Sequence, residues 1–428
     1  MELIAHSNLH VDDVLPQSGE RGLSLSQAFA RGTAAAAELG LRVRLSPLLD
    51  GSPGTWTCTL SHGEEKTRNG IGLGKGDRES ARTGALFEAL EHHLSGVDGL
   101  RPNMLRLRSA HDISRTDLTM DVAVSMLPEY ADAELACMPF SSLVTGHQVD
   151  VPLFLSVPDY LTDHGESLRT AIGDVYKYAV VGRYSANNGW AAGTDPVEAA
   201  VHAVNETIER DAHSLLLIDQ FLGRHTRTLR LVDPATLPKH LSVLLERAQD
   251  ITQSRVHLID MTTDLGVPAF LAFLSPSPGQ PARTRGCGAS LSRNYAITRS
   301  LTELIQAHTF FATEPEPEQH DETVPYPPLH ACRLADFTPM LNHATKIPYT
   351  DNAVPETPRE HLQQLVAILT AHGFVPYQRD HYVTDNLSVV NIFVPGLERF
   401  MLICDGHLVV PGKRGLRVKK AGMESRTI

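Results

Sequence analysis

The sequence predicts an α+β fold in which mixed sheets are combined with long helices. Strand-like and helical stretches interleave along the 428 residues without a regular strand–helix–strand rhythm, which argues against a doubly wound parallel sheet. A glycine-containing turn followed by a helix occurs at three places, but no solenoid period links them. Hydrophobic residues at 42% and charged residues at 21% are typical of a globular chain with a sizeable core.

The first part of the chain contains two predicted helices that flank a strand and a glycine-rich loop. TWTCTLSHG alternates apolar and polar residues as a half-buried strand does. We expect a helix at AFARGTAAAAELG, the loop at RNGIGLGKGD, and a second helix at RESARTGALFEALEHHL.

The rest of the chain contains two more turn-then-helix units and several strands. The predicted strands are YKYAVVGRYS, the pair RVHLIDMTTD and VPAFLAFLS, and later SVVNIFVPG and RFMLICDG. One helix is predicted after ANNGWAAGTD and a second at 235–249. A third is predicted after GCGAS, and a fourth from Pro358 to near Gly373. Residues 315–330 are rich in proline and acidic side chains and are predicted to be a loop or linker. We interpret residues 1–60 as an N-terminal segment of the same folding unit as residues 61–428.

Composition excludes several classes of function. The net charge of −12 argues against a general nucleic-acid binder, which usually has a basic surface. Five cysteines without a CxxC pair predict free thiols in a reducing compartment and no zinc-site spacing. No signal peptide is readable, and no run of about 18 apolar residues predicts a membrane span. A cytoplasmic location is therefore expected.

The helix that follows ANNGWAAGTD carries a row of acidic residues. Asp195 is the predicted N-cap, Pro196 is the first helical residue, and Val197, Val201, Val204 and Ile208 form a core-facing stripe. At about 100° per residue, Glu206 and Glu209 fall within about 80° of Glu198 around the helix axis. The side chain of His202 lies within the same angular range. Glu198 alone also fits a capping box with Asp195.

The same kind of acidic face recurs on two other predicted helices. Glu88 and Glu91 lie three residues apart, and Arg299, Glu303 and Gln306 fall within about 60° of one another. If the three faces converge, unpaired carboxylates are costly to desolvate unless cations lie among them. Mg²⁺ prefers oxygen ligands and often bridges carboxylates to phosphates, and Arg210 and Arg299 can bind phosphate oxygens. The recurrence therefore favours a polyphosphate–Mg²⁺ site over three solvated helix faces.

Other sites are less well supported by the sequence. The stretch GIGLGKGD fails the Walker A pattern at Asn69 and Gly76, so Lys75 is either a phosphate contact or part of a surface loop. A di-iron site requires Glu-x-x-His pairs, which this chain lacks at the acidic helices. Cys287 lies between two glycines, and without a visible base we interpret it as a small buried thiol.

The motifs GKGDRESARTGALFEALEHH, NNGWAAGTDPVEAAVHAVNETIERDA and ITRSLTELIQAH, followed by VPGLE, resemble those of the YcaO-domain family. The resemblance covers roughly residues 65–400 in the family's order and is nearest in appearance to the D component of microcin-type azole synthetases. It implies an unusual ATP-binding fold, with residues 61–428 as the YcaO domain. It also implies activation of a peptide backbone amide with ATP and Mg²⁺.

The resemblance assigns roles to individual residues. It implies Mg²⁺ binding by Glu88, Glu91, Glu198, Glu206 and Glu209. It implies ATP binding by a second set: Lys75, Thr194, Arg210, Arg299, Glu303 and Gln306. The chain departs from the family pattern at Gly84, His92, Thr194 and His308, and no catalytic residue is assigned.

We therefore expect a cyclodehydratase that converts Cys, Ser or Thr of a ribosomal precursor peptide into a thiazoline or oxazoline. A partner subunit with an E1-like or leader-binding module is expected, with an FMN-dependent azoline dehydrogenase as a further partner. One alternative is thioamide formation with a TfuA-type partner. A second alternative is a non-catalytic YcaO-like scaffold in a synthetase complex, which the four departures favour.

Overall fold

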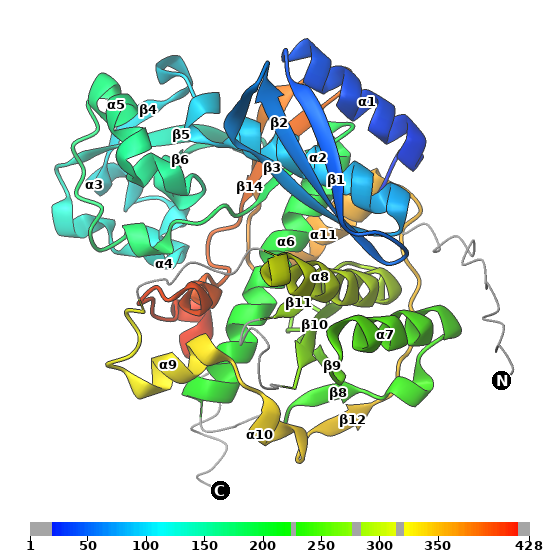
Figure 1. Cartoon of the computed structure of the whole chain (residues 1–428). Helices are drawn as coiled ribbons and strands as arrows, with labels where there is room; N and C mark the ends of the chain where they lie inside the picture. The colour runs from blue at the N-terminus through cyan, green and yellow to red at the C-terminus, as the bar shows by residue number, and fades with distance from the viewer. Residues whose placement is uncertain (1–18, 224–227, 276–283, 314–320, 418–428) are drawn as a thin grey trace, which may run out of the picture.

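The computed structural model describes residues 19–223, 228–275, 284–313 and 321–417, which form three sheets around a long central helix (Figure 1). That helix, α6 (Pro196–Leu217), contacts strands of two of these sheets. The prediction of an α+β fold with mixed sheets is confirmed. The Glu-x-x-Glu motifs lie on α2 (Arg78–Ser95) and on α6.

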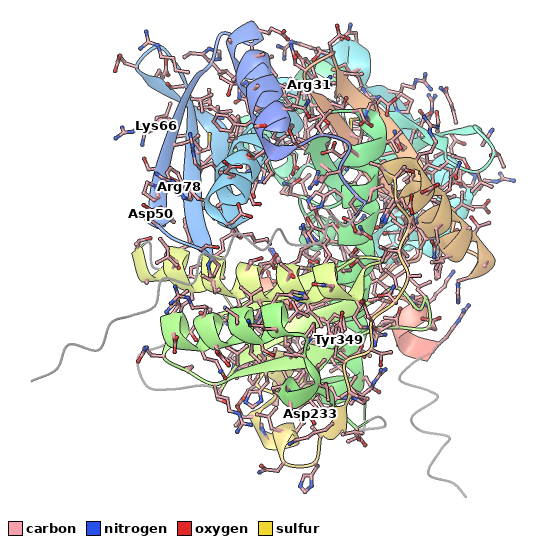
Figure 2. The ribbon with its side chains drawn as sticks, turned by 90° about the vertical axis from the view of Figure 1, so that its right-hand side faces the viewer. Arg31, Asp50, Lys66, Arg78, Asp233 and Tyr349 are labelled. Carbon is pink, nitrogen blue, oxygen red and sulfur yellow. The ribbon has the colours of Figure 1, made fainter. Side chains whose placement is uncertain are left out.

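The first sheet is an antiparallel meander covered by two helices. Its strands are β1 (Arg42–Leu49), β2 (Gly54–His62) and β3 (Glu65–Gly76). Helix α2 packs on β2 and β3, and α1 (Leu25–Glu38) packs on α2. Figure 2 shows Asp50 and Arg78 together at the edge of this sheet, where Nε of Arg78 lies 3.9 Å from Oδ1 of Asp50.

The second sheet joins the middle of the chain to its C-terminal part. Its strands, in order across the sheet, are β4 (Arg106–Ser109), β5 (Glu134–Ser142), β13 (Tyr377–Val383), β14 (Ser388–Phe393) and β7 (Trp190–Gly193), and β6 (Gln148–Pro152) also pairs with β5. The small residues Ala199, Ala200 and Ala203 of α6 are buried in a hydrophobic cluster with residues of β14 and of α11 (Pro358–Ala371). This packing fixes α6 across the sheet that ends in β7.

The third sheet is mixed. Its order is β11 (Arg285–Ala289), β10 (Ala269–Leu274), β9 (Val256–Asp260), β8 (Arg230–Val232) and β12 (Thr345–Ile347), with only the β8–β12 pair parallel among these described strands. Helices α7 (Lys239–Thr252) and α8 (Arg293–Thr313) pack against each other, α8 against β10 and β11 and α7 against β9. The stretches RVHLIDMTTD and VPAFLAFLS, which were predicted to pair, contain β9 and β10, and these two strands do pair in the structure.

The remaining helices are short or peripheral. They are α3 (Ala110–Ile113), α4 (Val122–Ser125), α5 (Asp163–Ile172), α9 (Pro327–Leu334) and α10 (Thr338–Leu341). Helix α11 begins with a capping box between Thr357 and Glu360 and has Pro358 in its first turn. Part of the predicted linker, 315–320, lies outside the described residues, and α9 begins within the rest of it.

The glycine-rich stretch before α2 is a strand, so the loop prediction was wrong. Gly72 and Gly74 lie in β3 directly against α2, and a Cβ on either glycine would collide with the backbone of α2 at Ala85 or Ala81. The glycines therefore permit close approach of strand and helix rather than a flexible loop.

Two predicted strands are also wrong. The stretch YKYAVVGRYS is irregular and ends in the 3₁₀ turn Gly182–Tyr184, because Asp174 accepts hydrogen bonds from the backbone of Tyr176 and the hydroxyl of Tyr178. RFMLICDG contains a 3₁₀ helix at Phe400–Asp405. A short apolar run that is buried on all sides has no periodicity that separates strand from helix.

Candidate functional site

The acidic face of α6 is set by a well-defined helix start. Oδ1 of Asp195 accepts hydrogen bonds from the backbone nitrogens of Val197 and Glu198, at 2.8 and 3.1 Å, so Asp195 is the N-cap as predicted. Further along the face, Glu206 forms an ion pair with Arg210 at 2.8 Å. Arg210 also donates to the carbonyl oxygen of Asn187, at 2.7 Å, which orients its guanidinium.

Helix α2 brings Glu88 and Glu91 to the same region. Oε2 of Glu91 accepts a hydrogen bond from the backbone nitrogen of Ala192 in β7, at 3.1 Å. Burial raises the pKa of Glu91 well above its ordinary value, and the negative charges of Glu206 and Glu88 raise it further. The carboxylates of α2 and α6 therefore repel one another, which is the condition that a bound cation relieves.

Helix α8 and strand β3 supply the third side of the site. Lys75 of β3 forms a short ion pair with Glu303 of α8, whose other oxygen accepts a hydrogen bond from the backbone nitrogen of Cys287 at 3.1 Å. Burial alone would raise the pKa of Glu303, but the ammonium of Lys75 overcomes this effect and the pKa is lowered.

Glu209 is the residue of the α6 face that lies beside Glu303, with carboxylate oxygens of the two residues within 4.8 Å of each other. Glu209 is 9% exposed, and burial together with the charge of Glu303 raises the pKa of its carboxyl to about 7. The guanidinium of Arg299 opposes this rise. The structure therefore brings together carboxylates from three helices, with Lys75, Arg210 and Arg299 as the neighbouring cations.

This donor set fits Mg²⁺ and a polyphosphate. Mg²⁺ takes oxygen ligands and keeps phosphates near carboxylates, while arginine and lysine bind the remaining phosphate oxygens. Gln306 lies one helical turn beyond Glu303, and its Nε2 is buried with no hydrogen-bond partner among the described residues. An unpaired buried donor at this position is suited to an acceptor on a bound molecule.

Glu198 and Thr194 lie in a different set of contacts. Oε1 of Glu198 is 2.9 Å from the guanidinium of Arg21, and Oε2 accepts a hydrogen bond from the Thr194 hydroxyl at 2.6 Å. The Glu198 side chain is therefore held by two protein donors and does not form the capping box. The metal-binding role of Glu198 remains a prediction, and it would have to share these two oxygens.

Residues 20 and 21 also contribute to this region, although no pattern in the sequence predicts it. Glu20 is buried beside Asn205, whose Nδ2 donates to it at 3.3 Å, and Ser290 donates a second, short hydrogen bond. Burial raises the pKa of Glu20, and the hydrogen bond from Ser290, with further help from the positive charge of Arg299, limits the rise. No periodic pattern surrounds these two residues, and their partners lie far along the chain, so only the folded structure reveals them.

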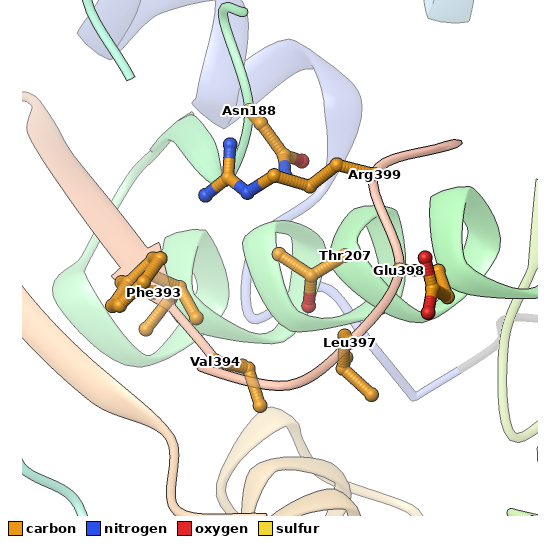
Figure 3. Close-up of a pocket in the computed structure, with 8 residues that line it drawn as sticks. Asn188, Thr207, Phe393, Val394, Leu397, Glu398 and Arg399 are labelled. Carbon is orange, nitrogen blue, oxygen red and sulfur yellow. The ribbon is translucent and has the colours of Figure 1, made fainter. Parts of the chain in front are cut away.

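The VPGLE motif lies outside the acidic cluster. Figure 3 shows Val394, Leu397 and Glu398 on a segment that crosses α6 near Thr207. Glu398 accepts hydrogen bonds from the backbone nitrogens of Gly412 and Gly415, at 3.0 and 2.6 Å. Asp211 of α6 pairs with Arg414 at 2.9 Å, so the motif and α6 together hold the segment that contains residues 412–415.

The described residues contain no helix that is both long and apolar enough to cross a membrane. Residues 73–398 match a protein-family model described as YcaO cyclodehydratase, ATP- and Mg²⁺-binding. A relative from Rhizobium leguminosarum bv. trifolii, described as an uncharacterized protein in the tfuA 3′ region, is 25% identical over 354 residues and 76% of each chain.

Several solved structures have the same fold. The structure of YcaO from Methanopyrus kandleri bound with AMPPCP and Mg²⁺ aligns with a TM-score of 0.65 and 16% identity, over 93% of this chain and 97% of that one. A heterocyclase in complex with substrate and cofactor gives a TM-score of 0.60 at 20% identity; 90% of this chain is covered, but only 54% of the heterocyclase. A chain of the E. coli microcin synthetase McbBCD complex with pro-MccB17 bound gives 0.56 at 14% identity, over 83% and 91% of the two chains.

Proposed function

The chain belongs to the YcaO family of ATP- and Mg²⁺-binding proteins, and we propose that it is the cyclodehydratase component of a peptide-modifying synthetase. Its substrate is a ribosomally made precursor peptide, and its product carries a thiazoline or oxazoline in place of a Cys, Ser or Thr. The observation that carries this proposal is the convergence of Glu88, Glu91, Glu206 and Glu209 beside Lys75, Arg210 and Arg299.

The reaction is a dehydration driven by ATP. The side-chain sulfur or oxygen of the substrate attacks the preceding amide carbonyl carbon, and the amide oxygen takes the γ-phosphoryl group, which releases ADP. The attacking thiol or hydroxyl gives up its proton to solvent. Loss of the amide proton and of phosphate, which carries away the amide oxygen, then forms the C=N bond of the ring, so the peptide loses the atoms of one water per ring. Such a reaction depends on positioning and on neutralising phosphate charge rather than on a protein nucleophile.

The residues divide into two sets by their chemistry. Glu88, Glu91, Glu206 and Glu209, with Glu198 as a further candidate, would hold Mg²⁺, which neutralises phosphate charge when bound. Arg210, Arg299 and Lys75 would bind phosphate oxygens, and Glu303 would hold Lys75 in place. Gln306 and Thr194 would contact the rest of the nucleotide.

Partners are part of the proposal. The YcaO-fold chain of the microcin synthetase acts in a complex that has been solved with pro-MccB17 bound. By analogy we propose that this chain works with an E1-like or leader-binding subunit and an FMN-dependent azoline dehydrogenase.

The test is ADP formation by the chain with its precursor peptide and partner. Replacing Glu206 with Ala removes one carboxylate and the ion-pair partner of Arg210. It should lower turnover by at least about 100-fold, the scale expected when a preorganised charged group is lost. Glu246→Ala, at an exposed glutamate of α7, is the matched control. Unchanged turnover in Glu206→Ala would remove the basis of the metal-site assignment.

A second candidate is thioamide formation, in which the activated amide oxygen is replaced by sulfur. The relative from the tfuA 3′ region, which matches over 76% of its length, favours it. Both reactions share the activation of the amide by ATP. Mass spectrometry of the product separates them, since ring formation loses one water whereas the thioamide gains a sulfur atom in exchange for an oxygen.

A third candidate is a scaffold that no longer binds nucleotide. Gly84, His92, Thr194 and His308 depart from the family pattern and favour it, whereas the intact acidic residues on all three helices oppose it. Calorimetric titration of the chain with ATP, with and without Mg²⁺, distinguishes the scaffold from an enzyme, because a scaffold that does not bind nucleotide gives no Mg²⁺-dependent heat of binding.

A further inference from the structure

Cys287 occupies a special position in β11. Gly286 and Gly288 face α8 so closely that a Cβ at either position would collide with the α8 backbone. Because side chains alternate along a strand, Cys287 points to the other face of the sheet, where α6 packs against β11. The residue is only 7% exposed.

The Cys287 thiol points into a cluster of possible metal ligands. Its Sγ and one carboxylate oxygen each of Glu209 and Glu303 all lie within 4.8 Å of one another. Each ligand comes from a different element, namely β11, α6 and α8. The thiol has no hydrogen-bond partner among the described residues, so an unpartnered buried group is directed at two carboxylates.

A thiol among carboxylates changes which cation the cluster prefers. Mg²⁺ is a hard ion and avoids sulfur, whereas Zn²⁺, Co²⁺ and Cd²⁺ combine thiolate with carboxylate ligands. Three protein ligands with an open fourth position form a common coordination set for such ions. Glu303 keeps ligand capacity, because Lys75 and the Cys287 backbone nitrogen use two of its roughly four lone-pair positions.

We propose that Cys287, Glu209 and Glu303 form a binding site for a thiophilic divalent cation such as Zn²⁺ or Co²⁺. The inference shares two residues with the proposed function, in which Glu209 is assigned to Mg²⁺ and Glu303 holds Lys75. An ion held by the thiolate occupies Glu209 and competes with Mg²⁺, so thiophilic ions inhibit the Mg²⁺-dependent reaction.

The test is a titration of the reduced, metal-free full chain with Co²⁺, followed by absorption spectroscopy. We expect a thiolate-to-cobalt charge-transfer band in the wild type. Cys287→Ser should lose this band and at least tenfold in Co²⁺ affinity. Cys332→Ser is the matched control, because a hydroxyl can make the same bond to the carbonyl oxygen of Pro328 that the Cys332 thiol makes at 3.3 Å; it should keep both.

A second variant guards against loss of folding in Cys287→Ser. Glu209→Gln should also weaken Co²⁺ binding at least tenfold, since it removes one ligand and leaves the thiol. Absence of the band in the wild type, its persistence in Cys287→Ser, or unchanged affinity in Glu209→Gln would overturn the proposal. Wild-type calorimetry with Mg²⁺ and ATP is run in parallel: no heat there contradicts the proposed function, whereas heat without a cobalt band contradicts only the thiophilic site.

Discussion

The guanidinium of Arg21 lies 2.9 Å from the carboxylate of Glu198 and thereby fastens the N-terminal segment to the first turn of α6. The Glu198 side chain is 5% exposed and that of Arg21 is 41% exposed. Solvent therefore reaches the guanidinium of Arg21 but not the carboxylate of Glu198. Residues 177 positions apart are joined at the edge of the candidate nucleotide site.

We expect a measurable coupling free energy between these two residues. Loss of Arg21 leaves a buried carboxylate with Thr194 as its remaining partner, so a double-mutant cycle of Arg21→Met and Glu198→Gln should give about 1–2 kcal/mol. Urea unfolding of the four proteins measures it. The exposed pair Arg42–Glu64 is the control and should show no measurable coupling. A coupling free energy for Arg21–Glu198 as small as that of the control pair would mean that this contact does not stabilise the fold.

Glu91 offers a test of carboxylate repulsion. Burial and the charges of Glu206 and Glu88 raise its pKa, so Glu91→Gln removes a source of repulsion and keeps an oxygen for the Ala192 backbone nitrogen. The metal-free variant should be more stable than the wild type by about 1 kcal/mol. It should also lose most of the rise in melting temperature that Mg²⁺ with ATP gives the wild type.

Differential scanning fluorimetry with and without Mg²⁺ and ATP measures both effects. Glu79→Gln, at an exposed position in the first turn of the same helix, should keep the ligand-dependent rise. A metal-free Glu91→Gln that melts below the wild type, with its ligand response intact, would contradict the assignment of Glu91 to a repelling cluster.

The sequence predicts the parts of the site that depend on helical periodicity. Asp195, Pro196 and the spacing of Glu206 and Glu209 determine the start and the acidic face of α6, because capping and the 3.6-residue repeat are local properties. Glu20 and Arg21 have no such local signal, since their partners come from distant elements. Glu198 was ambiguous in sequence because a carboxylate at that position fits a cap, a metal or an ion pair, and only the folded chain supplies Arg21.

The glycines of β3 were predicted to form a loop because their role depends on a tertiary contact. A glycine-rich stretch fits both a loop and a strand that lies close to a helix, and the second explanation requires knowledge of the tertiary contact. The two explanations predict different effects of substitution, which allows a direct test.

Gly74→Ala should be strongly destabilising, because the added Cβ would collide with the carbonyl oxygen of Ala81. We expect a loss of about 3 kcal/mol or more in the free energy of unfolding. Gly84→Ala is the control within the facing helix. There the nearest atom to the new Cβ is Cα of Gly74 at 3.6 Å, so removal of a helical glycine should stabilise the chain by up to about 1 kcal/mol. Urea unfolding distinguishes the two; a harmless Gly74→Ala would contradict the close packing of β3 on α2.

The buried carboxyl of Glu398 should make the stability of the chain depend on pH. Burial raises the pKa of its carboxyl to about 7 from 4.5; the backbone nitrogens of Gly412 and Gly415 limit the rise, and Asp211 and Asp121 add to it. Between these two pKa values the native chain binds a proton at Glu398 that the unfolded chain does not. The contribution of Glu398 is therefore fully present below pH 4.5 and is lost as the pH rises through about 7.

Glu398→Gln isolates this contribution, because the other buried carboxyls titrate in both proteins and cancel. The stability of the wild type relative to Glu398→Gln should fall by up to about 3 kcal/mol between pH 4.5 and 7, and then stay constant. Urea unfolding at several pH values and constant ionic strength measures the difference. A difference that is flat across this range, or that grows in favour of the wild type as the pH rises, would show that the two glycine backbone nitrogens hold Glu398 ionised throughout.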